Sequence, residues 1–347
     1  MKILLAHNLY EPYAKGGAEK VVKEMIEVFL IDNHELVLIT TKPKTKNREI
    51  EIKTENNLKI YYFPSSYYNL NKVNKALRFF WHLSNFCNPK RKSDYQEIIS
   101  QEKPDLVITH NLIGLGFFLL DLIKQKKINH QHFLHDIQLL HPSGLMMLGR
   151  EKMVNSCLAR LYQRFTKKYF TATNKIISPS NWLLQEHLSR GFFPQKEKEI
   201  RPFKNLVITD NIKKENKNFL FVGQLEKHKG IIFLITAFKK LESRDSKLII
   251  IGRGSDEEEA KRLARTDSRI SFLGQMTAIE LKAEMKKHDA LVVPSLCYEN
   301  SPTVIYEAQE VKLPVIAANI GGIKEIIQKN DCLFKAGNEE ELLDKLK

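Results

Sequence analysis

The chain has 347 residues, which is more than one compact core usually holds and about right for two α/β domains. Hydrophobic residues make up 43% of it and charged residues 28%, a composition that excludes a disordered chain. The longest apolar stretch, residues 112–123, is shorter than the ~20 residues that span a bilayer. Only four apolar residues separate Lys2 from His7, so we expect no signal peptide and place the protein in the cytoplasm.

The net charge of +14 is concentrated in the first part of the chain. Residues 1–204 hold 32 Lys and Arg against 19 Asp and Glu, whereas residues 205–347 hold 23 against 22. The basic part carries no helix-turn-helix, zinc-finger or aromatic RNA-binding signature, so we expect no nucleic-acid partner. Peripheral contact with an anionic membrane or a phosphorylated acceptor would explain the charge, and so would solubility alone. The four cysteines have no paired spacing, which indicates neither a disulfide framework nor a zinc site.

Short apolar strands and helices alternate through the first part of the chain. A strand over 2–6 leads through Gly16 and Gly17 into a helix with one apolar face. Two glycines directly before a helix let backbone amides approach a ligand closely. Further strands are predicted over residues 35–40, 59–63, 105–110, 130–135 and 175–180. The alternation predicts a doubly wound parallel sheet.

Two stretches of this part combine aromatic or apolar residues with basic ones. A predicted helix over residues 74–86 has an aromatic face and is followed by a basic run at 90–92. That profile fits an interfacial membrane contact, and it also fits packing against the core, which is the more common use of such a helix. Residues 153–170 allow the same two interpretations, a membrane contact or packing against the core.

Histidines follow the predicted strands. His110 and His135 fall at strand ends, and binding sites in parallel sheets lie beyond the carboxyl ends of the strands. His130, His132 and His141 are near in sequence, but 130 and 132 share a strand face opposite to 135. Without accompanying cysteine or acidic ligands, we expect no metal site.

The second part repeats the alternating pattern after a polar linker near residues 202–216. Apolar strands begin near 219, 248, 270, 291 and 314, which predicts a second Rossmann-like domain. The turn after its first strand carries Gln224, Lys229 and Gly230.

The stretch from 291 to 325 organises this second domain. After a buried strand and a loop, Ser301 is expected to cap a helix in which Pro302 takes the first position. The amides of Thr303 and Val304 would then lie at the positive end of the helix dipole, where they suit a phosphate.

Glu299 and Glu307 have seven residues between them and flank this helix start. A carboxylate beside a bound phosphate is costly unless it accepts hydrogen bonds from hydroxyls, so the pair indicates sugar recognition. A solvated acidic loop followed by an ordinary amphipathic helix explains the same spacing.

The string from 299 to 308 (ENSPTVIYEA), the strand at 313–317 and the Gly-Gly turn at 321–322 resemble retaining GT-B glycosyltransferases of group 1, the family 4 clan. The resemblance implies two Rossmann-like domains facing across a cleft. Residues 1–204 would form the acceptor side and residues 205–347 the nucleotide-sugar-binding domain. By comparison with the family we expect its C-terminal crossing helix to be absent from this sequence, and Lys312 stands where the family has glycine.

The resemblance assigns roles residue by residue. Gly16 and Gly17, with Lys15 beside them, would lie over the donor phosphates. His135 would hydrogen-bond the donor sugar as a neutral imidazole.

In the second domain Lys229 would grip the diphosphate, while Gln224 replaces an arginine of the family. By the same resemblance Glu307 would hold the ribose and Glu299 the hexose.

The implied activity is transfer of a hexose, with retention and without a metal or other cofactor. The donor would be a UDP- or GDP-sugar and the acceptor a glycan or lipid-linked glycan of cell-envelope polysaccharide synthesis. Two alternatives stay open: a non-catalytic nucleotide-sugar-binding protein, which Gln224 favours, and a GT-B UDP-sugar epimerase.

Overall fold

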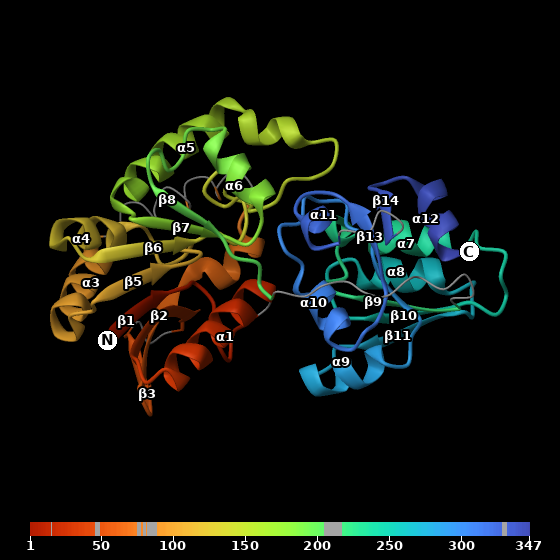
Figure 1. The fold of residues 1–347 in the computed structure, drawn as a ribbon, viewed down its shortest axis with the longest axis horizontal. Helices are drawn as coiled ribbons and strands as arrows, with labels where there is room; N and C mark the ends of the chain where they lie inside the picture. The colour runs from red at the N-terminus through yellow and green to blue at the C-terminus, as the bar shows by residue number, and fades with distance from the viewer. Residues whose placement is uncertain are drawn as a thin grey trace. The chain divides into compact units, whose positions relative to one another are not determined.

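Two β-sheets organise the chain, each within its own unit (Figure 1). The computed structural model describes residues 1–14, 16–45, 49–74, 78, 81, 89–204, 217–327 and 332–347. The first unit, here the N-unit, comprises residues 1–144, 156–179 and 184–201. The second, the C-unit, comprises residues 145–155, 180–183 and 202–347.

The described strands of the N-unit sheet run in the order β3-β4-β2-β1-β5-β6-β7-β8. Their bounds are β1 Lys2–Ala6, β2 Glu35–Pro43, β3 Glu51–Glu55, β4 Leu58–Ser65, β5 Leu106–Thr109, β6 Asn129–Phe133, β7 Lys175–Ser178 and β8 Glu197–Ile200. The helices and short 3-10 turns are α1 Gly17–Ile31, η1 Ser66–Lys72, α3 Pro89–Glu102, α4 Phe118–Lys126, α5 Cys157–Tyr169 and η3 Phe170–Ala172. Helix α6, Asn181–Leu188, begins in residues of the C-unit and ends in residues of the N-unit.

The C-unit sheet is parallel, and its described strands run β11-β10-β9-β12-β13-β14. The strands are β9 Asn218–Val222, β10 Lys247–Ile251, β11 Ile270–Gly274, β12 Ala290–Val293, β13 Val315–Asn319 and β14 Leu333–Lys335. The helices are η4 Lys227–Lys229, α7 Ile231–Phe238, α8 Glu257–Ala264, α9 Ala278–Met285, α10 Thr303–Glu310, α11 Ile323–Ile326 and α12 Glu339–Leu346, with η2 Glu151–Asn155 contributed by the earlier segment. Helix α7 contacts α8 and α12, while α9 contacts α10 (Figure 1).

The apolar strands are buried because helices cover the sheets. Leu4, Leu220, Leu291 and Ile316 have no exposed surface, and they lie in β1, β9, β12 and β13. Continuous apolar runs of this kind are typical of parallel strands covered on both faces. The two doubly wound α/β sheets that the sequence predicts are thus confirmed.

Strands β3, β8 and β14 were missing from the sequence prediction. Strand β3 reads EIKTE and is mostly exposed, so it carries no apolar pattern. It pairs antiparallel with β4 through a tight turn in which Asn56 has a φ of 51°, so the N-unit sheet is not wholly parallel. The predicted strand over 130–135 also ends earlier, at Phe133.

Several sequence predictions lie outside the described residues. These are the role of Lys15, nearly all of the predicted helix over 74–86, and most of the predicted linker over 202–216. The boundary between residues 204 and 205 therefore stays a prediction. Within the described ranges we find no helix that combines the length and the apolar character needed to cross a bilayer.

The last residue of α3 ties that helix to the N-unit sheet. The buried Glu102 carboxylate accepts hydrogen bonds from Lys2 Nζ at 3.1 Å, Lys59 Nζ at 2.6 Å and Tyr61 Oη at 2.5 Å. Burial alone would raise the pKa of Glu102, but these donors outweigh it and lower the pKa to about 2. The ionised carboxylate therefore stabilises the folded N-unit.

Two glycines of the C-unit differ in their surroundings although both have positive φ. Gly321 has a φ of 65°, and a Cβ there would lie 2.1 Å from the Glu299 carbonyl oxygen. Gly274 has a φ of 74°, and a Cβ there would meet nothing within 4 Å. Of these two glycines, Gly321 is the one that packs closely against the loop that carries Glu299.

Glu102→Gln is expected to lower the free energy of unfolding at pH 7 by on the order of 2 kcal/mol. The folded pKa is depressed, so this stabilisation is complete above the ordinary value of 4.5 and is lost as pH falls toward about 2. Urea unfolding at several pH values measures it. Glu97→Gln, an exposed site in the same helix, is the control. A gap between Glu102→Gln and the unaltered chain that does not narrow in acid would contradict the prediction.

Gly321→Ala is expected to destabilise the C-unit by more than Gly274→Ala does. Both variants place alanine at positive φ, which costs about 1–2 kcal/mol, but only Gly321→Ala also collides with the Glu299 backbone. Thermal unfolding of the two variants side by side measures the difference. Equal shifts in Tm would show that the packing against Glu299 contributes nothing.

Candidate functional site

The first candidate site lies in the C-unit at the carboxyl ends of β9 and β12. These strands are neighbours in the sheet, and the chain leaves them toward opposite sides, since β10 lies beyond β9 and β13 beyond β12. This is the switch point at which ligands bind in doubly wound sheets. The loop after β9 carries Lys229, and the loop after β12 carries Glu299.

The structure brings Lys229 and Glu299 into direct contact. Lys229 Nζ donates to Glu299 Oε1 at 2.7 Å. Ser295 Oγ donates to the same oxygen at 2.9 Å, and the Cys297 Sγ lies 3.7 Å from it. The Glu299 side chain is only 12% exposed and that of Lys229 28%, so the pair is largely shielded from water.

The pairing keeps both groups charged. Burial alone would lower the pKa of Lys229, but the negative charge of Glu299 outweighs it and raises that pKa. Burial would likewise raise the pKa of Glu299, but Lys229 and Ser295 lower it. The site therefore holds a fixed ammonium and a fixed carboxylate at neutral pH.

Backbone contacts hold the two loops together. The Leu296 N–H donates to the His228 carbonyl at 2.9 Å. Gly230, at a φ of 76°, approaches Pro294 so closely that a Cβ would lie 1.9 Å from the Pro294 carbonyl oxygen. On the Glu299 side, the Gly322 N–H donates to the Glu299 carbonyl at 2.7 Å. Backbone contacts of the neighbouring residues thus fix the positions of Lys229 and Glu299.

The start of α10 differs from the prediction. Ser301 is not its N-cap, and Pro302 is not its first residue: Pro302 has a ψ of 116°, which is extended, and the helix begins at Thr303. The Ser301 hydroxyl instead lies 2.9 Å from the Tyr306 hydroxyl. Thr303 and Val304 are the first two helical residues, so their amides belong to the helix start. Their binding of phosphate stays a prediction.

The remaining predicted residues of the C-unit lie close by in the chain. Gln224 follows β9 and Gly223, and its side chain is exposed. Glu307 lies one turn into α10 and is half-buried. Of the predicted cations, Lys229 is the one that the structure brings to Glu299.

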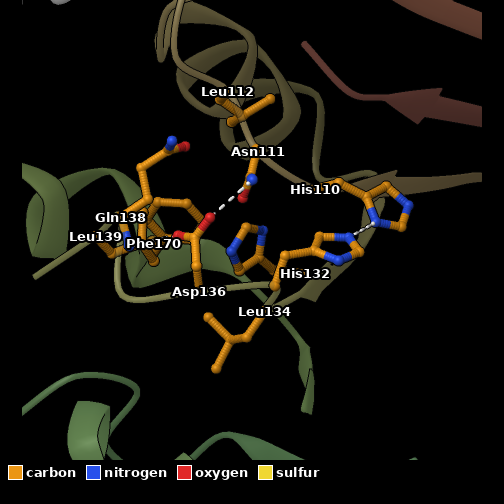
Figure 2. A pocket seen from close by; sticks show the side chains of 10 residues that line it. His110, Asn111, Leu112, His132, Leu134, Asp136, Gln138, Leu139 and Phe170 are labelled. Carbon is orange, nitrogen blue, oxygen red and sulfur yellow. Dashed lines mark hydrogen bonds between the residues drawn. The ribbon is translucent and has the colours of Figure 1, made fainter. Parts of the chain in front are cut away.

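A second candidate site lies in the N-unit, where three histidines follow three neighbouring strands. His7 follows β1, His110 follows β5, and His135 lies two residues beyond β6. His110 Nδ1 lies 2.8 Å from His135 Nε2, and the His7 ring is 5.7 Å from each of the other two rings. His110 and His135 line a small pocket with Asn111, Asp136 and Gln138, among others (Figure 2).

Two carboxylates adjoin these histidines. Glu19 Oε1 lies 3.7 Å from His7 Nε2, and Glu19 Oε2 accepts from the Gly16 N–H at 2.6 Å. The Gly16 amide is therefore already bound, and a phosphate at this turn would first have to displace Glu19. Gly17 is the first residue of α1.

Asp136 accepts from the Asn111 amide at 3.1 Å (Figure 2) and from the Gln138 N–H at 2.6 Å. Burial raises the pKa of Asp136 to about 6. Burial also lowers the pKa of His135 to about 3 and that of His110 well below its usual value. The two imidazoles are thus neutral, as a binder of uncharged hydroxyls would be.

His7, Glu19, Asp136 and Ser295 were missing from the predicted site residues. His7 follows the first strand directly, so the strand-end rule that selected His110 would have found it. Ser295 gave no sequence signal, because its importance comes only from its bond to Glu299.

His130 and His132 flank the Thr109 hydroxyl, at 2.8 Å each, and are buried within the sheet. Among the described residues, no group of three or more His, Cys, Asp or Glu side chains is arranged to hold a metal ion.

Two protein-family models match this chain, one in each half. The model for Glycosyltransferase Family 4 matches residues 15–202, and the model for group 1 glycosyl transferases matches residues 216–347. A 42.6 kDa protein in the cps region of Klebsiella pneumoniae is 29% identical over 94% of this chain and 87% of its own.

Solved structures show the same fold. Sucrose-phosphate synthase from Thermosynechococcus elongatus has a TM-score of 0.72 at 18% identity, covering 99% of this chain and 88% of that one. Anabaena HepE, in complex with UDP, has a TM-score of 0.68 at 16% identity, with coverage of 99% and 88%. The resemblance seen in the sequence is confirmed: the chain has the GT-B fold and belongs to glycosyltransferase family 4, among the group 1 glycosyltransferases.

Proposed function

We propose that this glycosyltransferase moves a hexose from a UDP- or GDP-sugar to a glycan or lipid-linked acceptor in cell-envelope polysaccharide synthesis. The observation that carries the proposal is the largely shielded Lys229–Glu299 pair at the switch point of the C-unit sheet. The relative in the Klebsiella cps region supports the envelope role, and the UDP complex of the Anabaena neighbour supports a nucleotide donor.

Lys229 would neutralise the departing diphosphate. As the bond between the anomeric carbon and the phosphate oxygen breaks, negative charge grows on that oxygen. An ammonium already fixed in a water-poor site stabilises this charge without reorganising at the moment of reaction. The amides of Thr303 and Val304 would add the positive end of the α10 dipole, so the step needs no metal ion.

Glu299 would bind hydroxyls of the donor hexose. When the donor binds, before any bond breaks, its diphosphate would draw the Lys229 ammonium from Glu299, and the Glu299 carboxylate would still be held by the Ser295 hydroxyl. Its freed acceptor positions can then bind sugar hydroxyls and lie near the positive charge that develops on the ring. Glu307 would bind the ribose diol in the same way.

The acceptor oxygen would attack the face that the phosphate leaves, so the anomeric configuration is retained. The leaving phosphate oxygen would take the acceptor's proton, which removes the need for a protein base. The role of His135 in binding the sugar stays a prediction. We place the protein in the cytoplasm, at the inner face of the membrane where lipid-linked acceptors are exposed.

Glu307→Ala is expected to weaken nucleotide binding by about 10- to 100-fold, because hydrogen bonds to a charged group contribute about 1.5–3 kcal/mol. Glu299→Ala is expected to lower kcat by about 100-fold or more while changing nucleotide affinity little. A thermal-shift screen of UDP-, GDP- and ADP-sugars identifies the donor, and calorimetry and product formation then measure the two effects.

The control for these variants is Glu310→Ala in the same helix. Glu310 pairs with Lys204 and Lys282 on the surface, and its loss should change neither quantity. Unchanged nucleotide affinity in Glu307→Ala would overturn the assignment of the ribose site.

Gln224→Arg tests the second candidate, a nucleotide-sugar-binding protein without activity. Arginine would restore a bidentate cation beside the diphosphate, so we expect a higher turnover number with little change in product. Gln224→Asn is the neutral control. A chain that binds UDP or GDP but transfers nothing, with or without arginine at 224, would favour the binding protein. Release of free nucleotide and an epimerised sugar without any acceptor would instead identify an epimerase.

A further inference from the structure

One face of helix α5 is fixed to the N-unit. Tyr162, Gln163 and Thr166 are buried, and each donates a side-chain hydrogen bond to a carbonyl of residues 138–140 at 2.8–3.0 Å. With the buried Ala159 they form one continuous inner face. The orientation of the rest of the helix is therefore set.

The outer side of α5 carries large apolar side chains. Leu158 is 64% exposed, and Leu161 and Phe165 are each 42% exposed. Residues at i, i+3 and i+7 lie on one stripe of a helix, so the three form a continuous ridge. We call these residues the α5 ridge. An amphipathic helix that only covered a core would turn such side chains inward.

A row of cations borders the α5 ridge. Arg160, Arg164 and Lys168 follow one another at i, i+4 and i+8, and all three are exposed. The structure gives these three side chains no ion pair with an acid of the described chain. The sequence of α5, CLARLYQRFTKKY, contains no Asp or Glu. An anionic surface is thus the complement of this helix.

We propose that α5 lies flat on a membrane that contains anionic phospholipid, with the α5 ridge inserted at the boundary between headgroups and acyl chains. Arg160, Arg164 and Lys168 then lie at the level of the lipid phosphates. The combination of an apolar stripe, a cationic border and no acid is the profile of helices that lie in the plane of the interface. The inference does not rest on the proposed hexosyl transfer.

The test measures sedimentation of the full chain with vesicles, in the absence of donor and acceptor. The chain is expected to bind mixed phosphatidylcholine–phosphatidylglycerol vesicles, to bind phosphatidylcholine alone weakly, and to dissociate as salt is raised. Cys157, exposed at the start of α5, can carry an environment-sensitive fluorophore in a Cys87→Ser background. Its emission should shift to the blue on binding as the helix leaves bulk water.

Two pairs of substitutions separate the ridge from its cations. Leu161→Ser with Phe165→Ser, and separately Arg160→Glu with Arg164→Glu, should each weaken binding to mixed vesicles by about tenfold or more. The matched controls are Ile31→Ser, at an exposed apolar site of α1, and Lys124→Glu with Lys126→Glu on α4; both should bind like the unaltered chain.

Equal binding by the α5 variants and the controls would overturn the proposal. So would failure of the unaltered chain to bind any vesicle, which would instead assign the ridge to a protein partner. Transfer activity on a water-soluble acceptor should survive in the α5 variants, so the membrane contact and the chemistry can fail independently.

Discussion

The charged pair of Lys229 and Glu299 is the constraint on which the C-unit site depends. Removing a lone ammonium or carboxylate from water is costly, and in a folded protein such a group usually neutralises instead. Each loop can hold its charge because the neighbouring loop supplies the opposite one. The ion pair offsets the desolvation cost of Lys229. A charged ammonium is therefore already present where a diphosphate would need it.

That arrangement requires two loops to approach more closely than side chains allow. Gly230 meets the Pro294 carbonyl, and Gly321 meets the Glu299 carbonyl, at distances that exclude a Cβ. The switch point between β9 and β12 brings the loops near each other, and the glycines close the remaining gap. Topology therefore places the site to within a few residues, and the absence of side chains at two positions sets its final geometry.

The sequence sufficed for features that repeat or that depend on chain connectivity. Alternating apolar strands predicted both sheets, and the strand-end rule placed His110 and His135 at one edge of theirs. Lys229 and Glu299 were predicted from motif spacing and the family resemblance. Sequence-based prediction failed where contacts with residues elsewhere in the fold determine the local structure. Ser301 looked like an N-cap, but its hydroxyl pairs with Tyr306 and the helix begins at Thr303. The Gly16 amide looked open, but Glu19 occupies it. Strand β3 has no apolar alternation, since it lies exposed at the edge of its sheet.

Burial affects the titratable groups of the two candidate sites in opposite ways. In the C-unit, pairing keeps Lys229 and Glu299 ionised despite burial. In the N-unit, burial without such pairing leaves His110 and His135 neutral and brings the pKa of Asp136 to about 6. A diphosphate that gains charge during reaction needs fixed positive charge, whereas uncharged sugar hydroxyls need donors and acceptors that carry none. The neutral imidazoles of His110 and His135 therefore fit uncharged ligand groups. On α5, by contrast, Arg160, Arg164 and Lys168 are exposed, and in our proposal they act on a membrane and take no part in this site.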